Sequence, residues 1–505
     1  MQYGFAIDQR TCIGCHACTV ACKSEHEVPL GQFRTWVKYV DKGEYPSTTR
    51  EFGVMRCNHC TDAPCVTICP TQALFKRDDG VVDFDKDRCI GCKSCMQACP
   101  YDAIYIDEDT HTAAKCNFCA HRIDQGLEPA CVVVCPTESI WMGDLDDPES
   151  GIRKFLSITP VQTRTPEQKT GPNVFYVGAS EAVLDPLAAP VDETYIWAQP
   201  DPQRLENRLD VEVDPRTNAR TTLNTAHPRP WGWRVWTYLW TKSIAAGAVL
   251  MAAILLLLAE DPTTLTGIVA PVLGALFASI TGVLLIWDLK RPERFYFLFT
   301  KPNPRSWLAL GSLVLLAFGA VITLWFLGYV LGSTTLVELM AWFGVPAAVM
   351  TAGYTAFLFG QAEGRDLWQS PVLFWHLQAQ ALMAGAGALL VLAPFVSASD
   401  DTIAALGVAL VVATAAHLLM LLVELGGRHS TRNAEVAAHI ITHGRYARSF
   451  WYGAIVLSLV VLAAGLAVAL GAPVWVGVAS GLVVQVPLLV YESVFVKAAQ
   501  DVPLS

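Results

Sequence analysis

The sequence predicts a two-part fold: a cysteine-rich domain outside the membrane, followed by an all-α bundle of eight transmembrane helices. Of the 505 residues, 53% are hydrophobic and only 16% are charged, and the mean hydropathy is +0.36. That composition is too apolar for an ordinary soluble enzyme. The apolar excess is uneven, because all sixteen cysteines lie between Cys12 and Cys135 while long uncharged runs begin only near Trp236.

The overall charge and the first residues narrow the possible partners and compartments. A net charge of −10 and a pI near 5.6, without a basic patch, argue against a nucleic acid as partner. The chain opens MQYGFAIDQRTCIGC, which lacks the basic and apolar regions of a secretory signal peptide. We therefore expect a reducing compartment, in which thiols are available to bind metal.

The cysteines form four groups of four, and every group ends with the spacing x3-Cys. In chain order the groups are Cys12-x2-Cys15-x2-Cys18-x3-Cys22, Cys57-x2-Cys60-x4-Cys65-x3-Cys69, Cys89-x2-Cys92-x2-Cys95-x3-Cys99 and Cys116-x2-Cys119-x11-Cys131-x3-Cys135. The first and third have the spacing of bacterial ferredoxins, in which three cysteines wrap one [4Fe–4S] cluster and the fourth reaches another. Zinc sites also use C-x2-C pairs, and disulfides are a further alternative. Four x3-Cys endings, three followed by proline, favour iron–sulfur clusters.

Residues 1 to about 180 resemble the four-cluster ferredoxin subunit of the dimethyl sulfoxide reductase, polysulfide reductase and formate dehydrogenase group of molybdenum enzymes. The resemblance implies an α+β, double-ferredoxin-like domain in which the outer groups pair with each other, as do the inner groups. It implies four [4Fe–4S] clusters, held by Cys12, Cys15, Cys18 and Cys135; by Cys116, Cys119, Cys131 and Cys22; by Cys57, Cys60, Cys65 and Cys99; and by Cys89, Cys92, Cys95 and Cys69. Lys23 stands where the other groups have proline, a departure that removes no ligand.

Composition divides the chain into a cluster domain at residues 1–184, an extended linker at 185–230 and a membrane domain at 231–505. The linker is rich in Asp, Pro, Asn and Arg and has no periodicity. Three histidines, His16, His59 and His121, lie within or beside the cysteine groups. They could tune a cluster through a hydrogen bond to sulfur, or simply face water.

Eight apolar segments predict eight membrane spans, because each is about the 20 residues needed to cross a bilayer. They are Tyr238–Ala259, Leu265–Trp287, Ser306–Leu331, Leu336–Gly360, Val372–Val396, Ile403–Leu425, Phe450–Leu470 and Pro473–Val494. With eight spans both ends lie on one side of the membrane. That side carries every Lys and Arg of the membrane half, whereas the opposite loops carry none. The positive-inside rule therefore places the cluster domain on the cytoplasmic side of the inner membrane. The alternative is that this basic face docks the acidic cluster domain or a partner subunit.

The membrane half resembles the polysulfide reductase membrane-subunit family of the NrfD type. The matching stretches are WDLKRPERF (Trp287–Phe295), FLFGQAEGRDLWQSP (Phe357–Pro371) and QDVPLS (Gln500–Ser505). The resemblance implies a natural fusion of two proteins that are separate in most relatives. It also implies a quinone site close to the last cluster, and no haem.

Polar side chains inside the spans are costly and mark candidate functional residues. They gather toward the cluster side: Asp288 closes span 2, Tyr354 lies near the end of span 4, Glu363 follows it, His376 begins span 5, and His417 and Glu424 lie in the last half of span 6. Quinone chemistry needs hydrogen-bond donors and a proton route, so Tyr354 and His376 are the predicted quinone contacts. The alternatives are interhelical hydrogen bonds, or a haem between His376 and His417. Tyr491 and Glu492 are predicted to anchor span 8 at the membrane interface.

These features predict an electron-transfer and quinone-reactive subunit of a membrane oxidoreductase. Electrons would pass through four clusters between membrane menaquinone or ubiquinone and a separate molybdopterin- or tungstopterin-dependent catalytic subunit. One alternative is the same module in a hydrogenase or a cytochrome-containing quinol-oxidising complex. Another is a redox-driven ion-translocating module, for which carboxylates in the middle of the membrane are expected.

Overall fold

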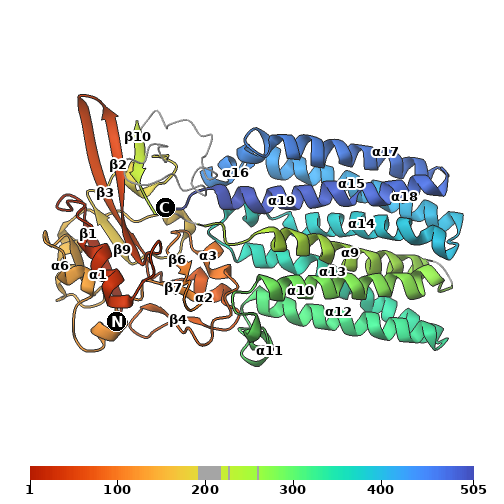
Figure 1. Ribbon diagram of the computed structural model, residues 1–505, viewed down its shortest axis with the longest axis horizontal. Helices are drawn as coiled ribbons and strands as arrows, with labels where there is room; N and C mark the ends of the chain where they lie inside the picture. Colours follow the sequence, from red (N-terminus) through yellow and green to blue (C-terminus); the bar gives the residue numbers. More distant parts are fainter. Residues whose placement is uncertain (191–217, 226–227, 259–260) are drawn as a thin grey trace.

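The computed structural model describes residues 1–190, 218–225, 228–258 and 261–505. It has the two predicted parts side by side: a small domain of short helices and strands, and a bundle of long, roughly parallel helices (Figure 1). Most of the predicted linker lies outside the described residues. Its described part adds a strand, β10 (Ala219–Leu223), to the small domain.

The small domain combines four sheets with helices that are mostly four or five residues long. Its strands are β1 (Tyr3–Asp8), β2 (Thr35–Glu44), β3 (Ser47–Arg56), β4 (Leu74–Lys76), β5 (Val82–Phe84), β6 (Ile104–Ile106), β7 (Ala113–Lys115), β8 (Ile140–Asp144), β9 (Val174–Val177) and β10. Its helices are α1 (Ala17–His26), α2 (Pro64–Ile68), α3 (Ser94–Ala98), α4 (Ala120–Ile123), α5 (Ala130–Val133), α6 (Gly151–Ile158), the 3-10 turn η1 (Pro166–Gln168) and α7 (Glu181–Leu184). This mixture confirms the predicted α+β class.

The sheets join parts of the domain that are far apart in the sequence. β1 pairs antiparallel with β8 and parallel with β9, so the first residues are held by the last part of the domain. The hairpin β2–β3 pairs Thr35 with Arg56 at one end and Glu44 with Ser47 at the other. β10 joins the free edge of β2, and the pairs β4–β5 and β6–β7 follow two of the cysteine groups.

The described residues contain eight helices long and apolar enough to cross a membrane, as predicted. They are α9 (Trp233–Leu258); η2 with α10 (Leu265–Asp288); α12 (Trp307–Val330); α13 (Thr334–Gly360); α14 with η5 (Leu373–Val396); α15 (Asp400–Gly426); η6 with α17 (Ser449–Ala469); and α18 (Val474–Val483) with α19 (Gln485–Asp501). Shorter elements at the cluster-side ends are η3 (Pro292–Arg294), α11 (Phe297–Thr300), η4 (Asp366–Gln369) and α16 (Arg432–Thr442).

Two predicted details of the spans are wrong. The first span does not begin at Tyr238, because α9 begins at Trp233 and places Lys242 more than two turns inside the helix. The last span does not end at Val494, because α19 continues about two turns further to Asp501. Tyr491 and Glu492 are therefore buried, at 1% and 2% exposure, instead of anchoring the chain at the interface.

α9 is the central helix of the bundle, and it packs so closely on α14 that their backbones touch. Of its most apolar stretch, 78% is buried, compared with 22% for α12 on the outside. A Cβ added to Gly247 of α9 would lie 1.7 Å from the carbonyl oxygen of Ala381, and one added to Gly385 of α14 would lie 2.0 Å from the backbone of Gly247. Small residues permit this approach in a membrane, where packing drives helix association.

Replacing Gly385 with alanine should therefore destabilise the bundle by about 1–3 kcal/mol, the usual cost of overpacking a tight contact. Gly319→Ala in α12 is the matched control, since a Cβ there meets nothing within 4 Å. Thermal unfolding of the purified, detergent-solubilised protein measures both changes. Equal stability of the two variants would show that the contact between α9 and α14 has room for a methyl group.

Candidate functional site

The structure brings the sixteen cysteine thiols together in the four crossed sets that the resemblance implies. Within each set the thiols interact electrostatically with one another. We name the first set Cys12, Cys15, Cys18 and Cys135; the second Cys116, Cys119, Cys131 and Cys22; the third Cys57, Cys60, Cys65 and Cys99; and the fourth Cys89, Cys92, Cys95 and Cys69. The two-stranded sheets and the short helices α1, α2, α3 and α5 position these thiols.

The chemistry of these donor sets fits iron–sulfur clusters. Burial raises the pKa of the Cys22 thiol well above its ordinary value and that of Cys18 to about 11. Such thiols stay protonated at neutral pH unless a metal binds and stabilises the thiolates. Across the described residues, no three His, Cys, Asp or Glu side chains lie close enough to share one metal ion.

The four sets follow one another in a line. Cys18 of the first set interacts electrostatically with Cys131 of the second. Cys116 of the second set interacts with Cys57 of the third, and Cys95 of the fourth with Cys65 of the third. The order along the line is therefore first, second, third, fourth.

The membrane half holds the loops of the fourth set. Asn303 donates to the backbone oxygen of Cys69 at 2.8 Å, Arg294 to that of Cys89 at 3.0 Å, and Trp231 to that of Cys92 at 3.4 Å. In Figure 1, α2 and α3 face the ends of the long helices, while α1 and α6 lie far from them. The fourth set is therefore the one next to the membrane domain.

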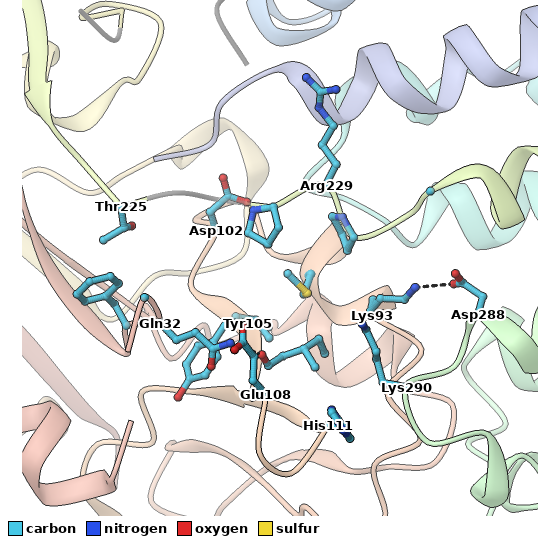
Figure 2. Close-up of a pocket in the computed structure, with 18 of the residues that line it drawn as sticks. Gln32, Lys93, Asp102, Tyr105, Glu108, His111, Thr225, Arg229, Asp288 and Lys290 are labelled. Atoms are coloured by element: carbon cyan, nitrogen blue, oxygen red, sulfur yellow. Dashed lines mark hydrogen bonds and ion pairs between the residues drawn. The ribbon is translucent and has the colours of Figure 1, made fainter. Parts of the chain in front are cut away.

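A cleft of about 720 Å³ lies between the cluster domain and the membrane helices, and it is lined by charged side chains. Figure 2 shows Lys93, from the loop of the fourth set, pointing across it to Asp288 at the end of α10. The ammonium and carboxylate groups are 2.7 Å apart, and Arg234 lies 4.0 Å from the same carboxylate. Burial lowers the pKa of Lys93, while the Asp288 carboxylate acts in the opposite direction. Asp288 thus connects the membrane domain to the fourth set.

Tyr354 belongs to a buried polar group in the interior of the bundle, between its helices. The ammonium of Lys242 lies 4.9 Å from the centre of the Tyr354 ring and donates to Thr355 at 2.5 Å. Tyr238 and Glu492 interact electrostatically with members of this group. Glu492 has no hydrogen-bond partner for either carboxylate oxygen in the described part of the chain. We call these five residues the Tyr354 group.

His376 belongs to a second buried group. Its Nδ1 lies 2.6 Å from Glu424 Oε2 and its Nε2 lies 2.8 Å from His417 Nδ1. Tyr491 and Ser370 donate to the two oxygens of Glu424, at 3.3 and 3.0 Å. Nε2 of His417 is buried and has no hydrogen-bond partner among the described residues. We call these five residues the His376 group.

The structure does not bring the candidate residues of the spans into one group. Tyr354 and His376 fall in separate groups, and Asp288 lies with Lys93 in the cleft. Glu363 belongs to neither group; it faces Asp62 of the cluster domain, and burial raises the pKa of its carboxyl. A haem between His376 and His417 is not compatible with ring nitrogens 2.8 Å apart, because an iron between them needs about 2 Å to each nitrogen.

Tyr491 and Glu492 join the two groups, and the sequence analysis missed their role. They are neighbours on α19; Tyr491 contacts Glu424, while Glu492 faces Lys242. Consecutive residues of a helix point about 100° apart, so the two side chains reach different groups. Glu492 is a carboxylate in an apolar run, although the predicted span ended only two residues later, at Val494. That carboxylate was the signal available in the sequence.

Comparison with known protein families agrees with this architecture. Residues 49–145 match the model of the 4Fe-4S dicluster domain, and residues 221–496 match that of polysulphide reductase, NrfD. The second match covers more than half of the 505 residues. The chain belongs to the NrfD family. It therefore joins, in one polypeptide, an iron–sulfur domain and an NrfD membrane domain.

Several curated proteins are similar to part of this NrfD-family chain. A tetrathionate reductase subunit of Salmonella typhimurium is 45% identical over 190 residues, which are 37% of this chain and 76% of that protein. A polysulfide reductase subunit of Wolinella succinogenes is 41% identical over 35% of this chain and 94% of its own length. The thiosulfate reductase electron transfer subunit PhsB of Salmonella typhi is 45% identical over 34% of this chain and 88% of its own length.

Proposed function

We propose that this chain passes electrons through four [4Fe–4S] clusters between a separate molybdopterin-type catalytic subunit and a quinone in the membrane. The carrying observation is the line of four cysteine sets whose last member is held by the membrane domain. Clusters held there supply one-electron transfer. The named relatives are subunits of tetrathionate, polysulfide and thiosulfate reductases, which supports a catalytic partner of that class.

We propose that the Tyr354 group binds the quinone head. It is linked to the fourth set through Asp288, which interacts with Tyr238 and pairs with Lys93. Lys242 and the tyrosine hydroxyls are donors suited to the carbonyl oxygens of a quinone. His376 has no ring nitrogen free for a direct contact, because Glu424 and His417 occupy both. We therefore propose that His376 acts in quinone chemistry through its hydrogen bonds to Glu424 and His417 and not by touching the quinone.

The His376 group is arranged to carry a proton between the bundle interior and the cluster side. Glu424 lies two residues from the end of α15, whereas His417 lies about two turns deeper. With Glu424 ionised, His376 Nδ1–H donates to it and His417 Nδ1–H donates to His376 Nε2. A proton that binds His417 Nε2 shifts the His417 Nδ1 proton to His376 and the His376 Nδ1 proton to Glu424. One proton is thereby transferred from His417 to Glu424, as quinol oxidation requires for each electron removed.

One observation favours the ion-translocating alternative as a second candidate. Glu492 is a buried carboxylate nine positions before the end of α19, with no hydrogen-bond partner among the described residues. Intramembrane carboxylates of this kind often take part in ion or proton pathways. Proteoliposomes with a dye that responds to membrane potential separate the two functions. Quinone chemistry that takes up and releases protons on one side does not charge the membrane, whereas ion translocation does.

The four-cluster proposal predicts about sixteen irons and sixteen sulfides per chain, because all sixteen ligand positions are cysteine. Anaerobic iron and acid-labile sulfide analysis of the purified complex measures both. A value near twelve, or bound zinc in quantity, would contradict four cubane clusters. Molybdenum or tungsten in the protein that co-purifies would identify the proposed partner.

The quinone proposal predicts different losses for the two polar groups. Glu424→Gln should lower quinone-linked turnover by about 100-fold, as loss of a proton-transfer group does, with little change in KM. Tyr354→Phe should instead raise KM, because it removes a donor to the quinone. Glu435→Gln on the exposed face of α16 is the control for a lost carboxylate. In all three variants the catalytic subunit should still reduce every cluster, as EPR detects; unchanged quinone kinetics in both test variants would show that these residues are structural.

We propose that the cluster domain faces the cytoplasm, on the basis of the loop charges. A cysteine introduced at exposed Glu149 should then be labelled by an impermeant thiol reagent in inverted vesicles but not in spheroplasts. Leu331→Cys, in the exposed turn after α12, should show the reverse. Labelling of the parent chain is subtracted in each case. The opposite pattern would place the cluster domain outside the cell and leave docking as the role of the basic face.

A further inference from the structure

Arg56 is a fully buried cation between the first and second cysteine sets. Its side chain is 0% exposed and its Nη1 donates to Cys131 Sγ at 3.3 Å. It also interacts electrostatically with Cys116 and Cys18, and its guanidinium lies 4.4 Å from the centre of the Phe5 ring. Nε and Nη2 of Arg56 are buried and have no hydrogen-bond partner in the described residues. Arg56 forms no ion pair with a carboxylate there, so its charge is directed at the thiols.

Three thiols of the second set face a buried cation, and the fourth lies against an imidazole ring. Cys131 accepts from Arg56, and Cys119 Sγ lies 3.1 Å from Nε2 of His26. Cys22 interacts electrostatically with Arg34, and Cys116 with both Arg56 and Lys115. Arg34 and Lys115 are themselves 5% and 0% exposed. Glu25, a carboxylate that interacts with Cys119, is already paired with His121 and Arg122.

The other three sets have fewer or weaker positive neighbours. The first set shares Arg56 through Cys18, and the third faces Lys115 through Cys65 and Arg365 through Cys99. The fourth set faces Arg294 through Cys89, while its Lys93 is paired with Asp288. The positive charge along the line is therefore greatest at the second set.

Adding an electron to a cluster adds a negative charge, which nearby buried cations stabilise strongly because the local dielectric is low. Charge and hydrogen bonds to sulfur are the main protein influences on cluster potential. We propose that the second set holds the cluster of highest reduction potential in the chain, and that Arg56 is the positioning residue that raises it most. This inference rests on the proposed four clusters.

The location has a consequence for electron flow. A quinone exchanges two electrons, but each cluster accepts only one, so the line must hold one electron while the second is transferred. An electron held at the second set lies two sets away from the membrane end. It is thereby separated from the quinone site while the fourth set becomes free for the next electron.

The test is anaerobic redox titration of the whole complex followed by EPR, which needs no turnover. In the unaltered protein, the first cluster to be reduced should be the one whose signal changes in Cys119→Ser. Arg56→Gln should lower the midpoint potential of that cluster more than that of any other, and Arg56→Lys should lower it less, since the charge remains. Arg50→Gln is the control for a lost arginine, because Arg50 is paired with Asp41 at the surface.

The possible outcomes are distinct. If Arg56→Gln does not assemble its clusters, His26→Gln is the second test. It removes only the ring nitrogen beside Cys119 and should lower the midpoint potential of the same cluster. Iron near sixteen with an unchanged midpoint potential of that cluster in the Arg56 and His26 variants overturns the inference about the second set. First reduction of a cluster other than that of Cys119 also overturns it. Iron near twelve in the unaltered protein contradicts the four-cluster proposal instead.

Discussion

The bond between thiolate and iron is the interaction on which the cluster domain depends. Its helices α2 to α5 have only four or five residues, too few for a stable helix, and two of its sheets have two strands each. The thiols, all but that of Cys15 buried or partly buried, form sets that join sequence groups up to about 120 residues apart, as Cys12 and Cys135 are. Metal binding free energy therefore contributes directly to folding here, in addition to the long-range pairing of β1 with β8 and β9.

The same crossing of ligands gives the line its direction. Because the last cysteine of one group reaches the set of another, the first and fourth groups share the far end and the two inner groups share the membrane end. The membrane domain then needs to recognise only the inner loops, which Asn303, Arg294 and Trp231 hold by backbone oxygens. Contacts to backbone oxygens fix the position of the fourth set without altering its ligands.

Spacing patterns in the sequence predicted much of this architecture. The cysteine spacing indicated four groups, the resemblance implied which thiols come together, and hydropathy located eight spans within about two turns of their observed ends. What could not be predicted is how each helix is rotated about its axis. Periodicity was of little help, because an apolar helix surrounded by lipid and other helices has no polar face to orient it. Tyr354 and His376 therefore looked like one site, although they face different neighbours.

Two missed cations did leave a signal. Arg56 and Lys115 directly precede Cys57 and Cys116, the first cysteines of two groups, so a charge beside each motif was visible in the sequence. What the sequence could not show is that both side chains turn away from solvent toward the second set. His26 had no such signal, because it belongs to no cysteine motif and reaches Cys119 only through the fold.

The basic face of the membrane domain has two roles, docking of the cluster domain and orientation of the chain in the membrane. A count of loop charges cannot separate them. Arg294 donates to backbone oxygens of the cluster domain, Arg365 binds Gln97 and lies 3.5 Å from Asp102, and Arg432 pairs with Asp185. These charges are required on the cluster side whichever compartment that side faces. Only basic residues without such a docking contact carry independent information about the orientation of the chain in the membrane. The positive-inside rule is therefore weaker evidence for a chain whose own soluble domain covers its basic loops.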